Sequence, residues 1–216
     1  MKEIKNLDFE ITKNSIDILK DISSKMEGKT FHYHTHILHD IRTSLGDSVK
    51  TYLEIGSYAG GSMSFMSSHI LPTKCYTVDL GHPIPQDIVE RNVKTFKNPD
   101  SPFKYFMGNS QDKGVIDIVR NEVKEIDILF IDGDHSRKGV LSDFTYYSDL
   151  VNIGGYIVFD DYLDYEFSPE VRGAVDEIVK EMNTDEYEII GSLKYDLLSE
   201  FTKMDTNNLF VIKKIK

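Results

Sequence analysis

The sequence predicts an α/β fold, a doubly wound and mostly parallel sheet whose last strand is antiparallel. From about residue 50 onward, short apolar runs alternate with segments of helical periodicity, which predicts right-handed βαβ crossovers covering both faces of a sheet. Near the end of the chain, two strand-like runs follow each other without a helix-length pattern between them. They indicate a closing antiparallel pair. The length of 216 residues fits one domain.

The parallel strands are predicted from apolar runs, listed here in chain order: Thr51–Ile55, Cys75–Asp79, Phe103–Met107, Ile126–Ile131 and Gly155–Phe159. Ile128 to Ile131 is apolar without alternation, which is typical of a central strand buried on both faces. The intervening helices are expected over Gly61–Leu71, Pro85–Phe96, Lys113–Glu125 and Arg137–Val151. A last helix is expected from Ser168, followed by the closing strands Tyr187–Ser192 and Leu209–Lys214.

Residues 1–48 are expected to form a helical cap within the same domain, and residues 49–216 its main body. Apolar side chains at helical spacing predict two helices here: Ile18, Leu19, Ile22 and Met26 in one, and Ile37, Leu38, Ile41 and Leu45 in the other. Gly46 is placed to end the second helix. We expect this cap to lie beside the carboxyl edge of the sheet.

The composition excludes several classes of protein. The net charge of −11 argues against a nucleic-acid partner, because phosphate contacts need clustered Lys and Arg. No apolar run approaches the roughly 18 residues of a membrane helix, and the N-terminus lacks a signal-peptide pattern. The single cysteine, Cys75, lies in a predicted strand and is expected to be buried. These features predict a protein of the cytoplasm, without a membrane partner.

A glycine-rich turn follows the first predicted strand, in the segment Tyr52–Gly61 (YLEIGSYAGG). Gly56 and Gly60 allow backbone angles and close ligand approach that a Cβ would forbid. The backbone N–H groups at the start of the next helix would face the ligand, as in nucleotide-binding βα turns. Glu54, just before the first glycine, suits a cationic ligand end better than a pyrophosphate.

Two further polar positions follow the next strands. Asp79 ends the second strand, where a carboxylate can accept both ribose hydroxyls of an adenosine. Gly108, Asn109 and Ser110 follow the third strand, where an adenine could lie against the loop.

With these motifs, residues 50–214 resemble class I S-adenosylmethionine-dependent methyltransferases. The resemblance implies a Rossmann-like sheet of order 3-2-1-4-5-7-6. It also implies a set of cofactor-binding residues: Glu54, Gly56, Ser57, Tyr58, Gly60, Asp79, Asn109, Ser110, Asp132 and His135. Within that set, Glu54, Gly56, Ser57 and Gly60 would surround the methionine part, and Ser110, with Gln111, would flank the adenine.

Three carboxylates, those of Asp132, Asp160 and Asp161, stand at the carboxyl ends of predicted strands. Neighbouring parallel strands would bring them to one edge of the sheet, where they need a cation or protons. Oxygen ligands favour Mg²⁺, with Ca²⁺ or Mn²⁺ as alternatives. The structural alternative is that Asp160 caps the next segment and Asp132 begins a turn.

The strings FIDGDHS and GGYIVFDDY around these aspartates resemble the metal-dependent O-methyltransferases, most closely the macrocin-type and cephalosporin-hydroxylase-like sugar-modifying group. The resemblance implies methyl transfer to a hydroxyl of a sugar, glycan or other small vicinal diol. His135 is the predicted general base. Asp132 or Asp134 are alternatives, and His135 could instead pack against the adenine.

A histidine-rich segment, Phe31–Asp40, precedes the sheet. Tyr33, His34 and His36 are predicted to contact the acceptor, together with Tyr162 after the fifth strand. A second metal site and a plain packing role are the alternatives for the histidines. Similar enzymes often pair through their N-terminal helices, which implies a homo-oligomer.

Two rival functions stay open at this point. One is a metal-independent small-molecule methyltransferase with structural aspartates. The other is a relative that keeps the fold but has a non-methylating role.

Overall fold

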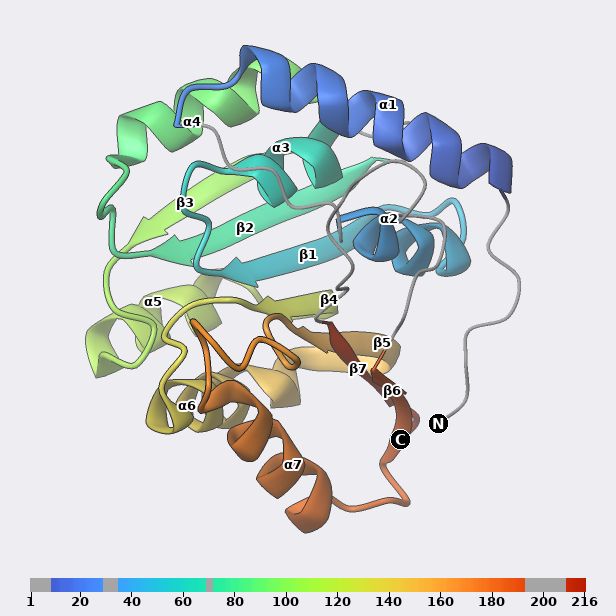
Figure 1. The fold of residues 1–216 in the computed structure, drawn as a ribbon, viewed down its shortest axis with the longest axis vertical. Coiled ribbons are helices and arrows are strands. Elements are labelled where there is room, and N and C mark those ends of the chain that lie inside the picture. Colours follow the sequence, from blue (N-terminus) through green and yellow to red (C-terminus); the bar gives the residue numbers. More distant parts are fainter. Residues whose placement is uncertain (1–8, 29–34, 69–71, 193–208) are drawn as a thin grey trace.

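A computed structural model describes residues 9–28, 35–68, 72–192 and 209–216. Its centre is a seven-stranded sheet of order β3-β2-β1-β4-β5-β7-β6 (Figure 1). The strands are β1 (Lys50–Ile55), β2 (Thr73–Asp79), β3 (Phe103–Met107), β4 (Ile126–Ile131), β5 (Val151–Phe159), β6 (Tyr187–Ser192) and β7 (Phe210–Lys214). All pairs from β3 to β5 are parallel, and β7 is antiparallel to β5 and β6. The predicted strand order and closing pair are confirmed.

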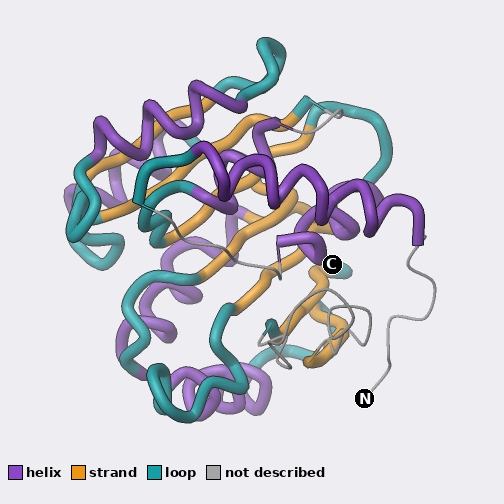
Figure 2. Tube along the Cα trace, turned by 45° about the horizontal axis from the view of Figure 1, so that its top comes forward, coloured by secondary structure: helices purple, strands orange, loops and turns teal. Residues whose placement is uncertain are grey.

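Helices cover both faces of this sheet (Figures 1 and 2). They are α1 (Phe9–Lys25), α2 (Thr35–Ser44), α3 (Gly61–Ser68), α4 (Gln86–Phe96), α5 (Lys113–Glu122), α6 (Arg137–Tyr147) and α7 (Val171–Glu181). One apolar cluster joins the sheet to α1–α4, through residues such as Ile22, Met63 and Val93. A second cluster joins the other face to α5–α7. The sheet is therefore buried on both sides, as its apolar strands require.

The start of β5 differs from the prediction. The helix expected to run to Val151 ends at Tyr147, and a 3₁₀ turn over Ser148–Leu150 leads directly into β5. Val151 already pairs with Ile126, and the register then shifts before Tyr156 pairs with Ile128. Gly154, with a φ of +88°, lies in this irregular stretch. The glycine pair at residues 154 and 155 thus marks a bulge inside the strand rather than its beginning.

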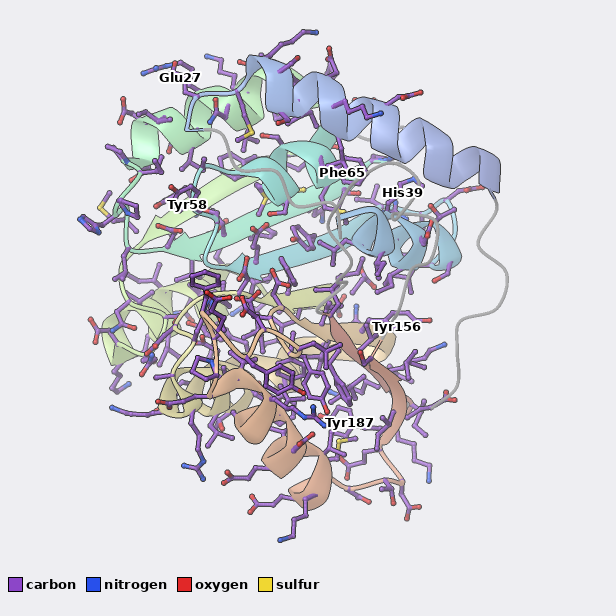
Figure 3. All side chains as sticks on the ribbon, viewed as in Figure 1. Glu27, His39, Tyr58, Phe65, Tyr156 and Tyr187 are labelled. Atoms are coloured by element: carbon purple, nitrogen blue, oxygen red, sulfur yellow. The ribbon has the colours of Figure 1, made fainter. Side chains whose placement is uncertain are left out.

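The N-terminal helices form as predicted, with Leu19, Ile22, Ile37 and Ile41 buried. The end of α1 does reach the carboxyl edge of the sheet. There the Asn92 side chain of α4 accepts a hydrogen bond from the backbone N–H of Glu27 and donates to the carbonyls of Glu27 and Ala59. Glu27 accordingly lies where α1 meets α4 (Figure 3).

The expected position is wrong for α2. Its buried Arg42 donates to the carbonyl of Pro72 and to Oγ1 of Thr73, where β2 begins, so this helix lies at the amino edge. The Arg42 guanidinium also donates to the carbonyls of Gly46 and Ser48. A buried cation needs several acceptors, and the loops before β1 and β2 supply them here.

Replacing Arg42 with methionine is expected to lower the free energy of unfolding by about 3 kcal/mol, because the acceptors of a buried charged donor are left unpaired. Urea unfolding followed by circular dichroism measures the change. Arg91→Met is the control, since Arg91 pairs with Glu27 and Asp87 at the surface and little change is expected there. Equal losses in the two variants would contradict this account of Arg42.

The structure also bears on two expectations drawn from composition. Cys75 is fully buried, as predicted. Among the helices of the described ranges, none combines the length and the apolar character needed to cross a membrane.

Candidate active site

The carboxyl ends of the central strands are held together by hydrogen bonds that continue the sheet beyond its strands. The N–H of Gly56 donates to the carbonyl of Val78, the N–H of Asp132 to that of Ile55, and the N–H of Asp160 to that of Ile131. The turns after β1, β4 and β5 are therefore fixed side by side. In an open parallel sheet this edge is where ligands bind.

A pocket of about 530 Å³ opens at this edge, a size suited to a nucleoside-sized ligand. The predicted residues that line it are Gly56, Tyr58, Asp79, Asn109, Ser110, Gln111, Asp132 and His135. Glu54 and Ser57 are buried, and neither they nor Gly60 line the pocket; they support the turn from within. Tyr58 lies on the turn that follows β1 (Figure 3).

Gly56 has a φ of +83°, and a Cβ at this position would lie 2.1 Å from the carbonyl oxygen of Asp132. Only glycine allows the turns after β1 and β4 to approach so closely. The residue thus joins the two halves of the site, the glycine turn and the acidic cluster.

Asp79 clamps the glycine turn. One carboxylate oxygen accepts hydrogen bonds from the backbone N–H groups of Ser57 and Tyr58, at 2.7 and 3.1 Å. The other accepts from the N–H of Gly81 and the hydroxyl of Tyr105, at 2.7 and 3.0 Å. Asp79 lines the pocket as predicted, but its lone pairs are already engaged. Its role toward a ribose stays a prediction and would require exchange of one of these partners.

Glu54 is completely buried beneath the turn and accepts hydrogen bonds from the hydroxyls of Tyr52 and Ser62. Burial, as the largest cause, raises the pKa of Glu54 to about 8, although both hydrogen bonds lower it. The carboxyl is therefore mostly protonated at neutral pH and adds little negative charge beside the pocket.

This shift predicts a pH dependence of stability. Between the ordinary pKa of 4.5 and the raised value of about 8, the folded chain holds a proton on Glu54 that the unfolded chain has lost. Its contribution to stability is complete below pH 4.5 and is lost as the pH rises to about 8. The loss is at most about 1.4 kcal/mol per pH unit.

Glu54→Gln does not titrate; its amide oxygen accepts from one of the two hydroxyls and its amide nitrogen donates to the other. Its urea-unfolding free energy should therefore fall less than that of the wild type between about pH 5.5 and 8, inside this window. Other groups that titrate in this range are present in both proteins and cancel in the comparison. Parallel pH profiles for the two proteins would rule out this assignment.

The acidic cluster is centred on His135. Its Nε2 lies 3.3 Å from Oδ1 of Asp132, and its Nδ1 lies 3.3 Å from Oδ2 of Asp161. The Ser168 hydroxyl lies 2.8 Å from the same Nδ1 and donates to Oδ2 of Asp161 at 2.7 Å. Ligand atoms of Asp132, His135 and Asp161 all lie within 4.8 Å of one another, a group able to hold a metal ion.

This group contains His135 where the sequence predicted Asp160. Asp160 is buried, and its Oδ1 accepts a hydrogen bond from the backbone N–H of Asp161. Asp161 itself has a φ of +57°, in the left-handed region that non-glycine residues rarely adopt. Among the described residues, Tyr58 shares this feature, with a φ of +45°. Such strain is often retained at functional sites.

The charges of the cluster shift its pKa values. Burial, followed by the charge of Asp160, raises the pKa of Asp132 to about 7. The hydrogen bond with Asp132 is the largest cause that raises the pKa of His135 to about 9. In the protein alone, an imidazolium therefore supplies the positive charge among these carboxylates, at a place where a divalent cation would fit.

Of the predicted acceptor residues, Tyr162 is the one whose side chain the structure describes. Tyr33 and His34 lie outside the described residues. His36 lies in α2, and its side chain also falls outside the description. Tyr162 is buried against Phe210, with ring centroids 4.6 Å apart, and donates its hydroxyl to Asp176. It does not line the 530 Å³ pocket.

The sequence does not single out Leu80 and His82, which line the pocket, or the contact between Ser168 and His135. The sequence predicts that Ser168 opens the last helix, which begins instead at Val171. The start of a helix is a sufficient local explanation for a serine that precedes a proline. The contact of Ser168 with His135, 33 positions away, is therefore not visible in the sequence pattern.

The strand order, the glycine turn after β1 and the carboxylate at the end of β2 together define a class I methyltransferase fold. A family model described as "Methyltransferase domain" matches residues 53–162, about half of the chain. The chain belongs to this methyltransferase family. It is also 35% identical over 204 residues to an uncharacterized protein of Acanthamoeba polyphaga mimivirus, covering 90% of this chain and 92% of that protein.

Solved structures agree in fold. The O-methyltransferase NovP matches with a TM-score of 0.63 at 16% identity, over 95% of this chain and 98% of NovP. The MycE methyltransferase of mycinamycin biosynthesis, solved with Mg and SAH, matches with a TM-score of 0.61 at 16% identity, over 96% of this chain and 54% of MycE. This chain thus spans about half of MycE. Identities this low establish the fold and leave the acceptor to be inferred.

Proposed function

We propose that this chain is an S-adenosylmethionine-dependent, divalent-metal-assisted O-methyltransferase acting on a hydroxyl of a sugar or another vicinal diol. The observation that carries the proposal is the cluster of Asp132, His135 and Asp161 directly beside the pocket at the glycine turn. A methyl-donor site and a cation site then share one edge of the sheet.

The donor part of the proposal rests on the pocket. Gly56 leaves the backbone of the first turn open, while Tyr58 and Asp79 line the pocket beside it. The loop of Asn109 and Ser110 lines it as well, where the adenine would lie. The family match supports this assignment, and MycE is a fold neighbour solved with SAH.

The cation part rests on the donor set. Carboxylates of Asp132 and Asp161 would hold the ion, with His135 as a third ligand or as a neighbour, and Asp160 close enough to raise the pKa of Asp132. Mg²⁺ suits the carboxylates, and Mn²⁺ suits a mixed set with imidazole. A bound cation would lower the pKa of a substrate hydroxyl and orient two neighbouring hydroxyls.

Side chains of the chain itself would hold the His135 ring in place and accept the proton of the substrate hydroxyl. Ser168 and Asp132 hold the His135 ring from its two nitrogens, so the ring faces the cluster in a fixed orientation. His135 can accept the hydroxyl proton only in its neutral form, which is favoured when Asp132 is engaged elsewhere. Asp134, whose Oδ2 accepts a hydrogen bond from Gln111 at the pocket, is the alternative base.

The net charge of −11 supports a small-molecule or glycan acceptor rather than a nucleic acid. A location in the cytoplasm and association into a homo-oligomer belong to the same proposal. They follow from the single cysteine and from the resemblance, respectively.

The test is methyl transfer from radiolabelled S-adenosylmethionine to a panel of sugars, nucleotide sugars and catechols. Each reaction is run with Mg²⁺, with a chelator, and with Mg²⁺ restored after the chelator. Transfer to a hydroxyl that the chelator abolishes and Mg²⁺ restores is the expected result. Transfer that is unaffected by the chelator would leave only the metal-independent alternative.

A further inference from the structure

Ser110 is held from two sides by helix α6. Its hydroxyl donates to Oδ1 of Asp143 at 2.6 Å, and its backbone carbonyl accepts a hydrogen bond from the hydroxyl of Tyr147 at 2.8 Å. Asp143 and Tyr147 are fully buried, whereas Ser110 lines the pocket. Asp143, which does not line the pocket, therefore fixes the orientation of the Ser110 hydroxyl.

Burying the Asp143 carboxyl in this position is energetically unfavourable. Burial, as the largest cause, raises its pKa to about 7, although the hydrogen bond from Ser110 lowers it. Its Oδ2 has no hydrogen-bond partner among the described residues and lies near the turn after β4, where a Cβ on Gly133 would be 3.5 Å away. A buried carboxyl with one unpaired oxygen costs stability, so a role beyond packing is expected.

We infer that Asp143 is a positioning residue that makes the Ser110 hydroxyl a hydrogen-bond acceptor toward the pocket, so that the site prefers a ligand base carrying an amino group. This inference rests on the proposed function, in which Ser110 flanks the adenine of the methyl donor. A hydroxyl has one proton and two lone pairs. Since the proton is given to Oδ1 of Asp143, only lone pairs face the ligand. Oδ1 can accept this proton whether the carboxyl is ionised or carries its own proton on Oδ2.

The chemistry favours 6-aminopurine over 6-oxopurine. Adenine presents an N–H donor at its 6-position, whereas hypoxanthine presents a carbonyl acceptor there. Two facing acceptors repel and leave a buried polar group unpaired. Oδ1 of Asn109 already accepts from the N–H of Gln111. Nε2 of Gln111 donates to Asp134, which leaves its Oε1 as a second acceptor at the pocket, and the Asp143 variants separate the two.

The experiment compares the dissociation constants of S-adenosylhomocysteine and S-inosylhomocysteine by isothermal titration calorimetry. The wild type is expected to prefer the adenosyl compound by about tenfold or more, the value of one hydrogen bond. Asp143→Asn retains an acceptor oxygen and should keep this ratio. Asp143→Leu removes the acceptor at similar volume, frees the hydroxyl to donate, and should bring the ratio close to unity.

A ratio is insensitive to a general loss of folded protein, which would weaken both ligands equally. Asp143→Leu binding both compounds at the wild-type ratio would overturn the inference alone. Ser110→Ala is the second variant should Asp143→Leu not fold; an unchanged ratio there also overturns it. A folded wild type that binds neither compound overturns the proposed function and this inference with it.

Discussion

Gly56→Ala is expected to abolish ligand binding at the pocket and to destabilise the fold by more than about 4 kcal/mol, or to prevent folding. The added Cβ would lie 2.1 Å from the carbonyl oxygen of Asp132, and backbone atoms cannot move aside as a flexible side chain can. The positive φ of +83° adds strain of its own. Chemical denaturation and calorimetric titration with S-adenosylhomocysteine measure the two effects.

Gly46→Ala is a matched control for this substitution. Gly46 has a φ of +80°, but a Cβ there would meet nothing within 4 Å. It carries the backbone strain without the overlap, so a loss of only about 1–2 kcal/mol and unchanged ligand binding are expected. Similar behaviour of the two variants would show that the approach of the turns after β1 and β4 is not the constraint described above.

Asp161→Asn is expected to weaken Mn²⁺ binding roughly 100-fold or more, because the charge of the ligands sets the affinity for hard cations. Methyl transfer should fall roughly 1000-fold, since a metal ion contributes several kcal/mol to the transition state. The amide retains an acceptor for the Ser168 hydroxyl, so the loop should keep its conformation. Electron paramagnetic resonance of bound Mn²⁺ measures the first effect independently of any acceptor.

Asp164→Asn is the control in the same loop. Its Oδ1 accepts from the backbone N–H groups of Glu166 and Phe167, which an asparagine also allows, and the change of charge is identical. Normal Mn²⁺ affinity is expected. If Asp161→Asn binds Mn²⁺ as tightly as Asp164→Asn does, the carboxylate of Asp161 is not a ligand.

The sheet order and the edge that holds the site could be predicted because both depend on patterns local in the chain. Alternating strand and helix periods fix the parallel part, and residues after strand ends, such as Gly56, Asp79 and Asp132, necessarily meet at one edge. The metal ligands Asp132, Asp160 and Asp161 stay a prediction, and the group whose ligand atoms lie close together contains His135 where the sequence predicted Asp160. Which of two adjacent carboxylates turns toward the cluster depends on the left-handed backbone of Asp161, which spacing does not encode.

Other contributions depend on side chains that meet across long sequence separations. Asn92 joins the end of α1 to the glycine turn, but the sequence shows it only as one of several residues at helical spacing. From the sequence, Arg42 would be expected at the surface, but in the structure the loops around β1 and β2 surround it. Asp143 lies inside a helix, and its link to Ser110 spans 33 positions. Local periodicity contains no information on such partners.

Calorimetric titration of the wild-type chain with S-adenosylhomocysteine, with Mg²⁺ present, tests the central claim most directly because it requires no acceptor. We expect one site per chain with micromolar affinity, and a rise in the melting temperature that follows the ligand concentration. A folded chain that gives neither heat nor a shift in melting temperature at near-millimolar ligand would contradict it.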